Sequence, residues 1–217
     1  MGNIPLNLFL ITGLLFVWNL AIIHLVSKWV YDFILKKYNG VPAEYVGRKI
    51  VHIFNGGITA LLVPIFYEGY FWIVIVSAFL FTGYIYFRRR WRLMYWFQVK
   101  ENAYEVNFAL MYGITLMIGV AVGDIWVGLI PILFMSFGDS ATGLIRAFTQ
   151  RRRIKSWDGT VAMIVVCSVI GYWKLGWYGV LVGIVVSFIE KIPRIDDNIT
   201  VPIVAAILVY LNIFIIQ

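Results

Sequence analysis

The chain has 217 residues, 62% of them hydrophobic and 13% charged, and its mean hydropathy is +0.87. Soluble domains carry about 25% charged and about 45–50% apolar residues, so this composition excludes a water-soluble globule. The formal net charge of +7 would favour nucleic-acid binding in a soluble protein, but in a membrane protein it indicates basic loops on the cytoplasmic side. We therefore predict one integral membrane domain over residues 1–217, with no nucleic-acid partner.

The apolar runs predict an all-α bundle of about eight membrane-spanning helices, because each crossing takes about 20 apolar residues. The first run has no basic residue before it, which favours a permanent helix over a cleaved signal. The predicted spans are residues 6–26, 50–67, 70–87, 107–123, 125–145, 160–175, 177–190 and 199–216.

Basic residues fall in alternate connections between these spans. Every Lys and Arg except Lys174 lies in one of four predicted cytoplasmic loops, at about 27–49, 88–106, 146–159 and 191–198. The positive-inside rule then places both termini on the non-cytoplasmic side. The outer turns are too short to hold a site, so we expect any active site to face the cytoplasm. The segment SKWVYDFILKKY at the start of 27–49 fits either an interfacial helix or an extension of the first span.

Asp139, in the segment FGDSATGLIRAF, is the first candidate site residue. It lies about 21 Å along the fifth predicted span at 1.5 Å per residue, and a charge at such a depth is costly and usually functional or paired. Gly138 and Ser140 beside it are small enough for a ligand or another helix to approach. The structural alternative is a packing residue with Arg146 as its partner.

The segment KSWDGT, residues 155–160, comes directly before the sixth predicted span. Lys155, the hydroxyls of Ser156 and Thr160, and the backbone amides near Gly159 predict a cradle for phosphate at a helix start. Asp158 fits either a helix cap or a carboxylate ligand of a metal. The sequence contains no GxxxxGK[ST] motif, so this is not a P-loop.

Two further segments carry polar side chains at the cytoplasmic ends of spans. Asp196, Asp197 and Asn198 offer hard oxygen ligands of the kind that Mg²⁺ prefers; the alternative is a loop with a helix cap. Arg48 and His52 are four residues apart and therefore share a helical face.

Together with Lys49, the residues Arg48 and His52 predict an anion site. The alternative for His52 is a packed interfacial residue. Three residues are weaker candidates: Asn55, Glu101 and Glu105. The two glutamates fit equally well as partners of Lys100 or of the Arg88–Arg92 cluster.

Four segments in this order resemble the CTP-dependent polyprenol kinase family, which includes dolichol, phytol and geranylgeraniol kinases. They are RKIVHIFNGG (48–57), FGDSATGLIRAF (137–148), KSWDGT (155–160) and DDNITVP (196–202). The closely spaced GDS and KSWDGT segments are the most specific part. The chain departs from the family at Asp158, where members often carry Glu, and at Thr149, where a Gly often follows the residue matching Phe148.

The resemblance implies that the γ-phosphoryl group of CTP is transferred, with Mg²⁺, to the hydroxyl of a long isoprenoid alcohol such as geranylgeraniol, phytol or dolichol. The expected catalytic residues are Asp139, Asp158 and Lys155. The expected metal ligands are Asp139, Asp196, Asp197 and Asn198. The expected nucleotide-binding residues are Arg48, Lys49, His52, Gly138, Ser140, Arg146, Lys155, Ser156, Gly159 and Thr160.

Two other functions fit the same residues. A membrane cytidylyltransferase acting on a lipid phosphate would use the same nucleotide and metal but release pyrophosphate. A transporter would also carry polar residues within its spans, although transporter sites tend to lie near the midplane between inverted repeats.

Overall fold

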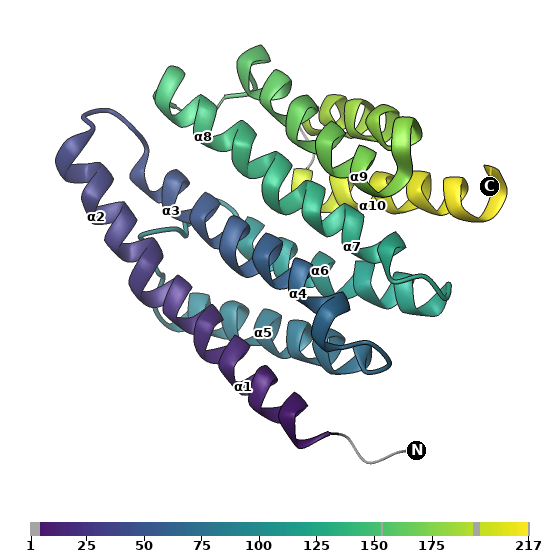
Figure 1. Ribbon diagram of the computed structural model, residues 1–217. Helices are drawn as coiled ribbons and strands as arrows, with labels where there is room; N and C mark the ends of the chain where they lie inside the picture. The colour runs from purple at the N-terminus through teal and green to yellow at the C-terminus, as the bar shows by residue number, and fades with distance from the viewer. Residues whose placement is uncertain (1–4, 153, 193–195, 217) are drawn as a thin grey trace.

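The computed structural model describes residues 5–152, 154–192 and 196–216, and this part of the chain is helical with no strand (Figure 1). Arg153, Arg194 and part of the predicted loop 191–198 lie outside the described residues. The α-helices are α1 (Leu6–Ala21), α2 (Ser27–Lys37), α3 (Ala43–Val51), α4 (Thr59–Phe66), α5 (Phe71–Trp91), α6 (Tyr104–Ala121), α7 (Trp126–Leu133), α8 (Asp139–Thr149), α9 (Trp157–Glu190) and α10 (Asp197–Leu211). Four π-helical segments join or extend them: η1 (Ile22–Val26), η2 (His52–Ile58), η3 (Phe134–Gly138) and η4 (Asn212–Ile216).

The π-helical segments join shorter helices into long ones. Within the described residues, seven helices are long and apolar enough to cross a membrane: Leu6–Lys37, Ala43–Phe66, Phe71–Trp91, Tyr104–Ala121, Trp126–Thr149, Trp157–Glu190 and Asp197–Phe214. The predicted all-α, multi-pass membrane architecture is therefore confirmed at the level of fold class.

The count of seven differs from the predicted eight because α9 contains two of the predicted spans. Gly176, in the middle of α9, has a φ of +59°, which breaks the helical path; this is a conformation that glycine adopts readily. A Cβ on Gly171 would collide with the backbone of Gly179, and a Cβ on Gly183 would collide with the backbone of Cys167. These pairs are centred on residue 175, so α9 is a tight hairpin of two antiparallel arms, as Figure 1 shows.

Three of the predicted cytoplasmic loops are shorter than expected. In the range 27–49, α2 continues α1 through η1 and α3 begins at Ala43, so SKWVYDFILKKY extends the first helix. In the range 88–106, α5 continues to Trp91 and α6 begins at Tyr104. In the range 146–159, α8 continues to Thr149. The amino-acid composition predicted where these connections occur. The helices extend beyond the apolar runs, however, because backbone hydrogen bonding continues into the polar residues that follow.

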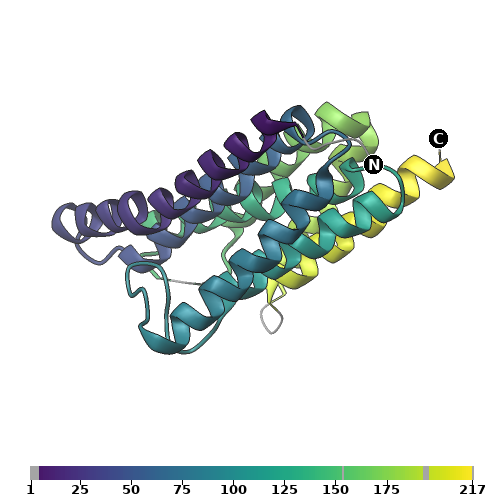
Figure 2. The ribbon, with the colours of Figure 1, turned by 90° about the horizontal axis from the view of Figure 1, so that it is seen from below.

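The helix formed by α7, η3 and α8 is the central element of the bundle. In its most apolar window 78% of the residues are buried, against 11% for Leu6–Lys37. One buried cluster joins α6, α7 and η3 to α9 and α10, and a second joins α7 to α1, α4, α5 and α6. Seen from below, α1 and α5 lie on opposite sides of the bundle axis (Figure 2).

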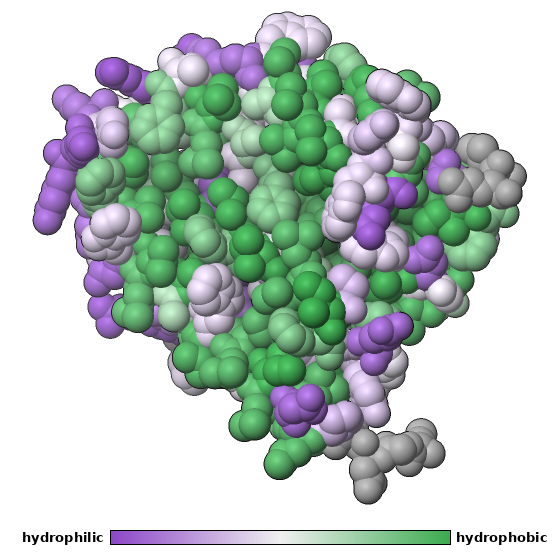
Figure 3. Space-filling view, viewed as in Figure 1, coloured by the Kyte–Doolittle hydropathy of each residue, from purple (hydrophilic) through white to green (hydrophobic). Residues whose placement is uncertain are grey.

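The outer surface is dominated by apolar side chains, as expected for a lipid-facing protein. Hydrophobic colour covers most of the face in Figure 3; hydrophilic colour gathers along the left and upper edge, with smaller patches on the right and near the lower edge. Figure 1 draws the α2–α3 connection and the end of α8 at that edge. In both ribbon views the described chain begins and ends at the opposite end of the bundle.

Candidate active site

Two π-helical segments bring the candidate residues His52 and Asp139 together. His52 begins η2, and Asp139 directly follows η3. The two segments pack against each other, and a Cβ on Gly56 of η2 would collide with the Ser136 side chain of η3. Single π-helical turns are frequent at functional sites. The glycine therefore permits the close approach that sets η2 against the start of α8.

Asp139 is buried and paired with a basic residue from α3. Its Oδ2 lies 2.5 Å from Lys49 Nζ and 3.3 Å from His52 Nδ1. The Ser140 hydroxyl donates to the Lys49 carbonyl at 3.3 Å. A Cβ on Gly143 would collide with the Lys49 side chain, so this glycine leaves the space that Lys49 occupies.

His52 lies between Asp139 and Phe108. Its ring stacks on the Phe108 ring with centroids 3.9 Å apart, and the side chain is 2% exposed. Neither ring nitrogen makes a well-aligned hydrogen bond to any described residue, including Asp139 at 3.3 Å. A buried polar group without a partner is rare in native structures. His52 is thus held rigidly with its polar atoms available.

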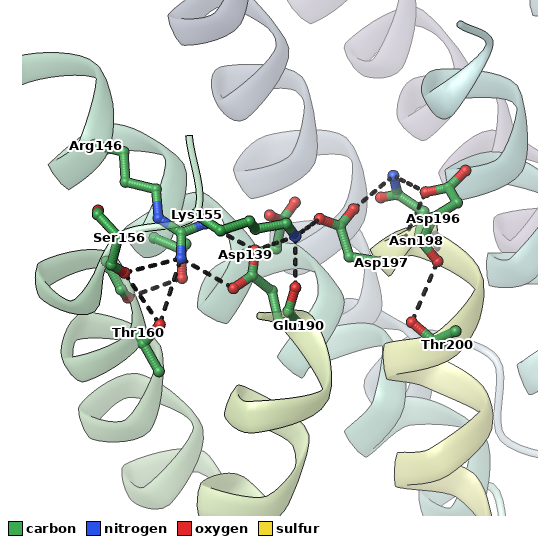
Figure 4. A network of polar contacts seen from close by, with 12 residues as sticks. Asp139, Arg146, Lys155, Ser156, Thr160, Glu190, Asp196, Asp197, Asn198 and Thr200 are labelled. Atoms are coloured by element: carbon green, nitrogen blue, oxygen red, sulfur yellow. Dashed lines mark hydrogen bonds and ion pairs between the residues drawn. The ribbon is translucent and has the colours of Figure 1, made fainter. Parts of the chain in front are cut away.

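Arg146 and Glu190 form a second buried ion pair, drawn in Figure 4. The guanidinium donates to both carboxylate oxygens of Glu190, at 2.8 and 3.1 Å, and the two side chains are only 2% and 1% exposed. The same guanidinium donates to the Ser156 carbonyl at 3.1 Å. A Cβ on Gly159 would collide with the Arg146 side chain, so Gly159 provides space for it.

Lys155 joins the end of α9 to the start of α10. Its Nζ lies 2.6 Å from Glu190 Oε1 and 2.7 Å from Asp197 Oδ2 (Figure 4). Burial alone would lower the pKa of Lys155, but the charges of Asp197 and Glu190 outweigh that effect and raise the pKa above its usual value. Lys155 is therefore a cation at any physiological pH, bound to two carboxylates and 24% exposed to solvent.

Three carboxylates converge at this point. Asp139, Glu190 and Asp197 each have an oxygen within 4.8 Å of the others'. Carboxylate oxygens are the ligands that hard cations such as Mg²⁺ prefer, and the facing Lys49, Arg146 and Lys155 are the groups that bind phosphate. We call these six residues the ionic network. Its formal charges cancel, as expected for charges held away from water.

The sequence analysis missed Glu190. The signal was present, because Glu190 ends an apolar run and stands seven residues before Asp197 in EKIPRIDD. Asn107 of α6 was also missed; its amide donates to Asp196 Oδ2 at 2.5 Å.

Several predicted site residues lie beside the ionic network but are not among its six charged residues. Asp158 accepts hydrogen bonds from the Thr149 hydroxyl at 2.5 Å and from Gln150 at 3.2 Å, in a partly exposed position. Thr160 donates to the Ser156 carbonyl at 3.1 Å, within the first turn of α9, and its hydroxyl accepts a hydrogen bond from the Arg146 guanidinium at 3.4 Å. Gly138 packs closely against Cys167. These residues order the start of α9 and the packing of η3.

Asp196 is the N-cap of α10, since its Oδ1 accepts from the Asn198 backbone amide at 2.9 Å. Burial raises the pKa of Asp196, against the lowering effect of hydrogen bonds from Asn107 and Asn198. The sequence left open whether this segment caps a helix or supplies carboxylates to a polar site. The structure shows one aspartate in each position: Asp196 is the helix cap, and Asp197 belongs to the ionic network.

The two candidate glutamates, Glu101 and Glu105, lie in different environments. Glu105 is buried and accepts from Arg89 at 2.8 Å and from Gln98 at 3.0 Å, which is the pairing with the arginine cluster that the sequence left open. Glu101 is exposed in the turn before α6.

A largely apolar cavity of about 130 Å³ begins at Arg48, His52 and Glu105. The guanidinium of Arg48 also lies over the rings of Tyr45 and Tyr104, at 5.2 and 5.6 Å. The cavity is lined by four long helices and two connections. The helix of α1 contributes Thr12, Leu15, Phe16 and Asn19, and the helix from α3 through η2 to α4 contributes Arg48, Val51, His52, Asn55, Thr59 and Val63. The remaining lining residues are Val74, Ser77, Ala78, Phe81 and Ile85 of α5, Glu105, Phe108, Ala109 and Tyr112 of α6, and Tyr67 and Phe97 of the connections. Asn55, a weaker candidate, donates from Nδ2 to the Asn19 carbonyl at 3.1 Å and so ties η2 to α1.

Comparison of the chain with protein-family models, with curated proteins and with solved structures found no match.

Proposed function

We propose that this chain is a membrane kinase that transfers the γ-phosphoryl group of CTP to the hydroxyl of an isoprenoid alcohol. The observation that carries the proposal is that an apolar cavity meets the ionic network at His52. His52 lines the cavity on one side and lies 3.3 Å from Asp139 on the other. A reaction between a lipid alcohol and a charged nucleotide requires such a junction.

On the polar side, the ionic network supplies both kinds of group that a metal–triphosphate complex needs. Asp139, Glu190 and Asp197 fit a divalent cation, for which we propose Mg²⁺, because their oxygens converge within 4.8 Å. When bound, the cation would neutralise phosphate charge during transfer. Lys155 and Arg146 would then pair with phosphate oxygens in place of the carboxylates, so that no buried charge would be left unpaired.

On the apolar side, the cavity offers one charged end and a long apolar body. Arg48 and His52 lie at the charged end, whereas Val63, Val74 and Phe81 line the body. An isoprenoid alcohol has the same distribution of polarity. Its hydroxyl would lie at His52 and its tail between α1, α4, α5 and α6.

The proton of the hydroxyl needs an acceptor when the oxygen attacks the γ-phosphorus. The new oxygen–phosphorus bond forms as the bond from the γ-phosphorus to the bridging oxygen breaks, and CDP leaves. His52 faces the cavity and has polar atoms available, so we assign proton acceptance to His52, with Asp139 beside it to stabilise the protonated ring. Asp158 hydrogen-bonds Thr149 and Gln150 instead, which favours a capping role for it.

We also propose eight membrane crossings, with both termini outside and the ionic network facing the cytoplasm. The hairpin of α9 supplies the eighth crossing. The start and the end of the described chain lie at the same end of the bundle, which supports an even number of crossings (Figures 1 and 2). The Lys and Arg clusters of the connections support the cytoplasmic assignment.

The test uses the purified protein in detergent with CTP, Mg²⁺ and geranylgeraniol. We expect CDP and geranylgeranyl monophosphate as products, and loss of both when EDTA removes the metal. Supplying geranylgeranyl monophosphate in place of the alcohol tests the cytidylyltransferase alternative, which predicts release of pyrophosphate. Absence of phosphorylated alcohol with CTP, UTP and ATP alike would refute the kinase proposal.

A further inference from the structure

The cavity that begins at the ionic network has a definite length. On the helix from α3 through α4 its lining residues run from Arg48 to Val63, fifteen residues apart, which corresponds to about 22 Å at 1.5 Å per residue. On α5 they run from Ile85 to Val74, eleven residues apart, or about 16 Å. The cavity therefore reaches through about half or more of a hydrocarbon core about 30 Å thick.

An aromatic group closes the end that is remote from His52. Tyr67, which caps the end of α4, is 2% exposed, and its hydroxyl lies 2.9 Å from the Thr12 hydroxyl of α1. Tyr67 and Tyr112 belong to one buried cluster with Val63 and Leu116. The buried Leu8 and Leu129 belong to the same cluster as Tyr67 and do not line the cavity, so a linear tail entering from the His52 end would stop at Tyr67.

The length of the cavity corresponds to a short isoprenoid. An extended chain advances about 1.2 Å per single bond, so an isoprene unit of four chain bonds spans about 5 Å. A cavity of about 16 to 22 Å then holds about three to four units. Building on the proposed kinase function, we infer that Tyr67 is a chain-length stop that limits the preferred acceptor to three or four isoprene units.

A competing path for a longer tail leads sideways toward the lipid. Phe16 lines the cavity and is also 56% exposed on α1. A tail that left the cavity beside Phe16 would not meet Tyr67, and acceptor length would then have no limit. The two paths predict opposite effects of substitutions at Tyr67 and Phe16.

The experiment measures three acceptors of increasing length: farnesol, geranylgeraniol and solanesol, with three, four and nine isoprene units. One readout is kcat/KM for phosphorylation; the other is thermal stabilisation of the detergent-solubilised protein without nucleotide. We expect solanesol to be used about 10- to 100-fold less well than geranylgeraniol, as for misfit in apolar pockets generally, and to stabilise the protein less.

Tyr67→Ala should raise the solanesol-to-geranylgeraniol ratio at least about tenfold, whereas Tyr67→Phe keeps the ring and should keep the cut-off. Ala78→Phe, which fills the body of the cavity, should move the preference toward farnesol, and it tests the stop even if Tyr67→Ala does not fold. Equal use of all three alcohols, or release of the cut-off by Phe16→Ala but not by Tyr67→Ala, would overturn the inference.

The two readouts separate this inference from the kinase proposal. Length-dependent stabilisation without phosphoryl transfer refutes the kinase and retains the stop. Phosphoryl transfer without a length limit refutes the stop and retains the kinase. Failure of every alcohol to stabilise the protein refutes the stop as well.

Discussion

The ionic network and the cavity lie side by side but satisfy their polar groups in opposite ways. Each charged side chain of the network has a partner of opposite sign within 2.8 Å. Along the cavity, by contrast, His52 Nδ1 and Nε2, Asn55 Oδ1, Glu105 Oε2 and the Tyr112 hydroxyl have no hydrogen-bond partner among the described residues. Buried polar groups are normally paired. Among the six residues of the network only one buried side-chain atom, Arg146 Nε, lacks a hydrogen-bond partner within the described chain, whereas several such atoms line the cavity.

The helices around the network and the cavity also differ, in how deeply they are buried. The central helix Trp126–Thr149 is mostly buried and contributes Asp139 and Arg146 to the network. The helix Leu6–Lys37, which covers the cavity, is mostly exposed. Substitutions in the network should therefore cost stability as well as activity, and those around the cavity should change specificity. Four predictions test this contrast.

The largest effect is expected from Glu190→Leu, which removes the carboxylate shared by Arg146 and Lys155. Breaking a buried ion pair costs about 3–5 kcal/mol because the other charge stays buried. Thermal unfolding in detergent measures the loss. Glu68→Leu, at an exposed turn, should change stability by less than about 0.5 kcal/mol. If Arg146→Met added to Glu190→Leu restores no stability, the loss does not come from the unpaired charge.

Asp139→Asn should lower kcat by about 100-fold or more, since the neutral amide stabilises neither a metal nor a protonated His52. Asp158→Asn is the matched control, because Asp158 makes its hydrogen bonds to Thr149 and Gln150. It should retain kcat within about tenfold, a smaller loss than removal of a catalytic group produces. Steady-state kinetics on both variants checks the pair, and equal losses would contradict the assigned roles.

Gly159→Ala places a Cβ against the Arg146 side chain and should destabilise the protein by about 1–3 kcal/mol through overpacking. Gly13→Ala is the control on the exposed helix, because no described neighbour lies within 4 Å of its Cβ position. That variant should be neutral or more stable by up to about 1 kcal/mol. Chemical denaturation of both proteins gives the difference, and similar stabilities would show that the network tolerates displacement.

The smallest effect is expected at the far end of the cavity. Thr12→Val removes the hydroxyl that contacts Tyr67 at 2.9 Å, and hydrogen bonds between membrane helices contribute about 0.6 kcal/mol on average. Thr82→Val is the matched control, since Thr82 donates only to Ala78 of its own helix, at 2.8 Å. A double-mutant cycle with Tyr67→Phe measures the coupling; a loss of several kcal/mol would mean that α1 is held more firmly than its exposure indicates.

The membrane class, the helical fold and several residues of the ionic network could be predicted from the amino-acid sequence alone. Composition is sufficient for the first two, because only helices satisfy backbone polar groups within lipid over such lengths. Asp139, Lys155 and Asp197 could be selected because charges in or beside apolar runs are costly. The basic loops could also be predicted, because Lys and Arg fall in alternate connections between the apolar runs.

Which of these residues lie in contact depends on the tertiary packing of the helices. Lys49 and Asp139 are 90 residues apart in sequence, and Lys155 and Asp197 are 42 apart, so no local pattern links them. The same packing separates Asp196 from Asp197, excludes Asp158 from the ionic network and adds Glu190 to it. The cavity ending at Tyr67 is formed by four helices at once, and its length depends on how those helices pack rather than on any one segment.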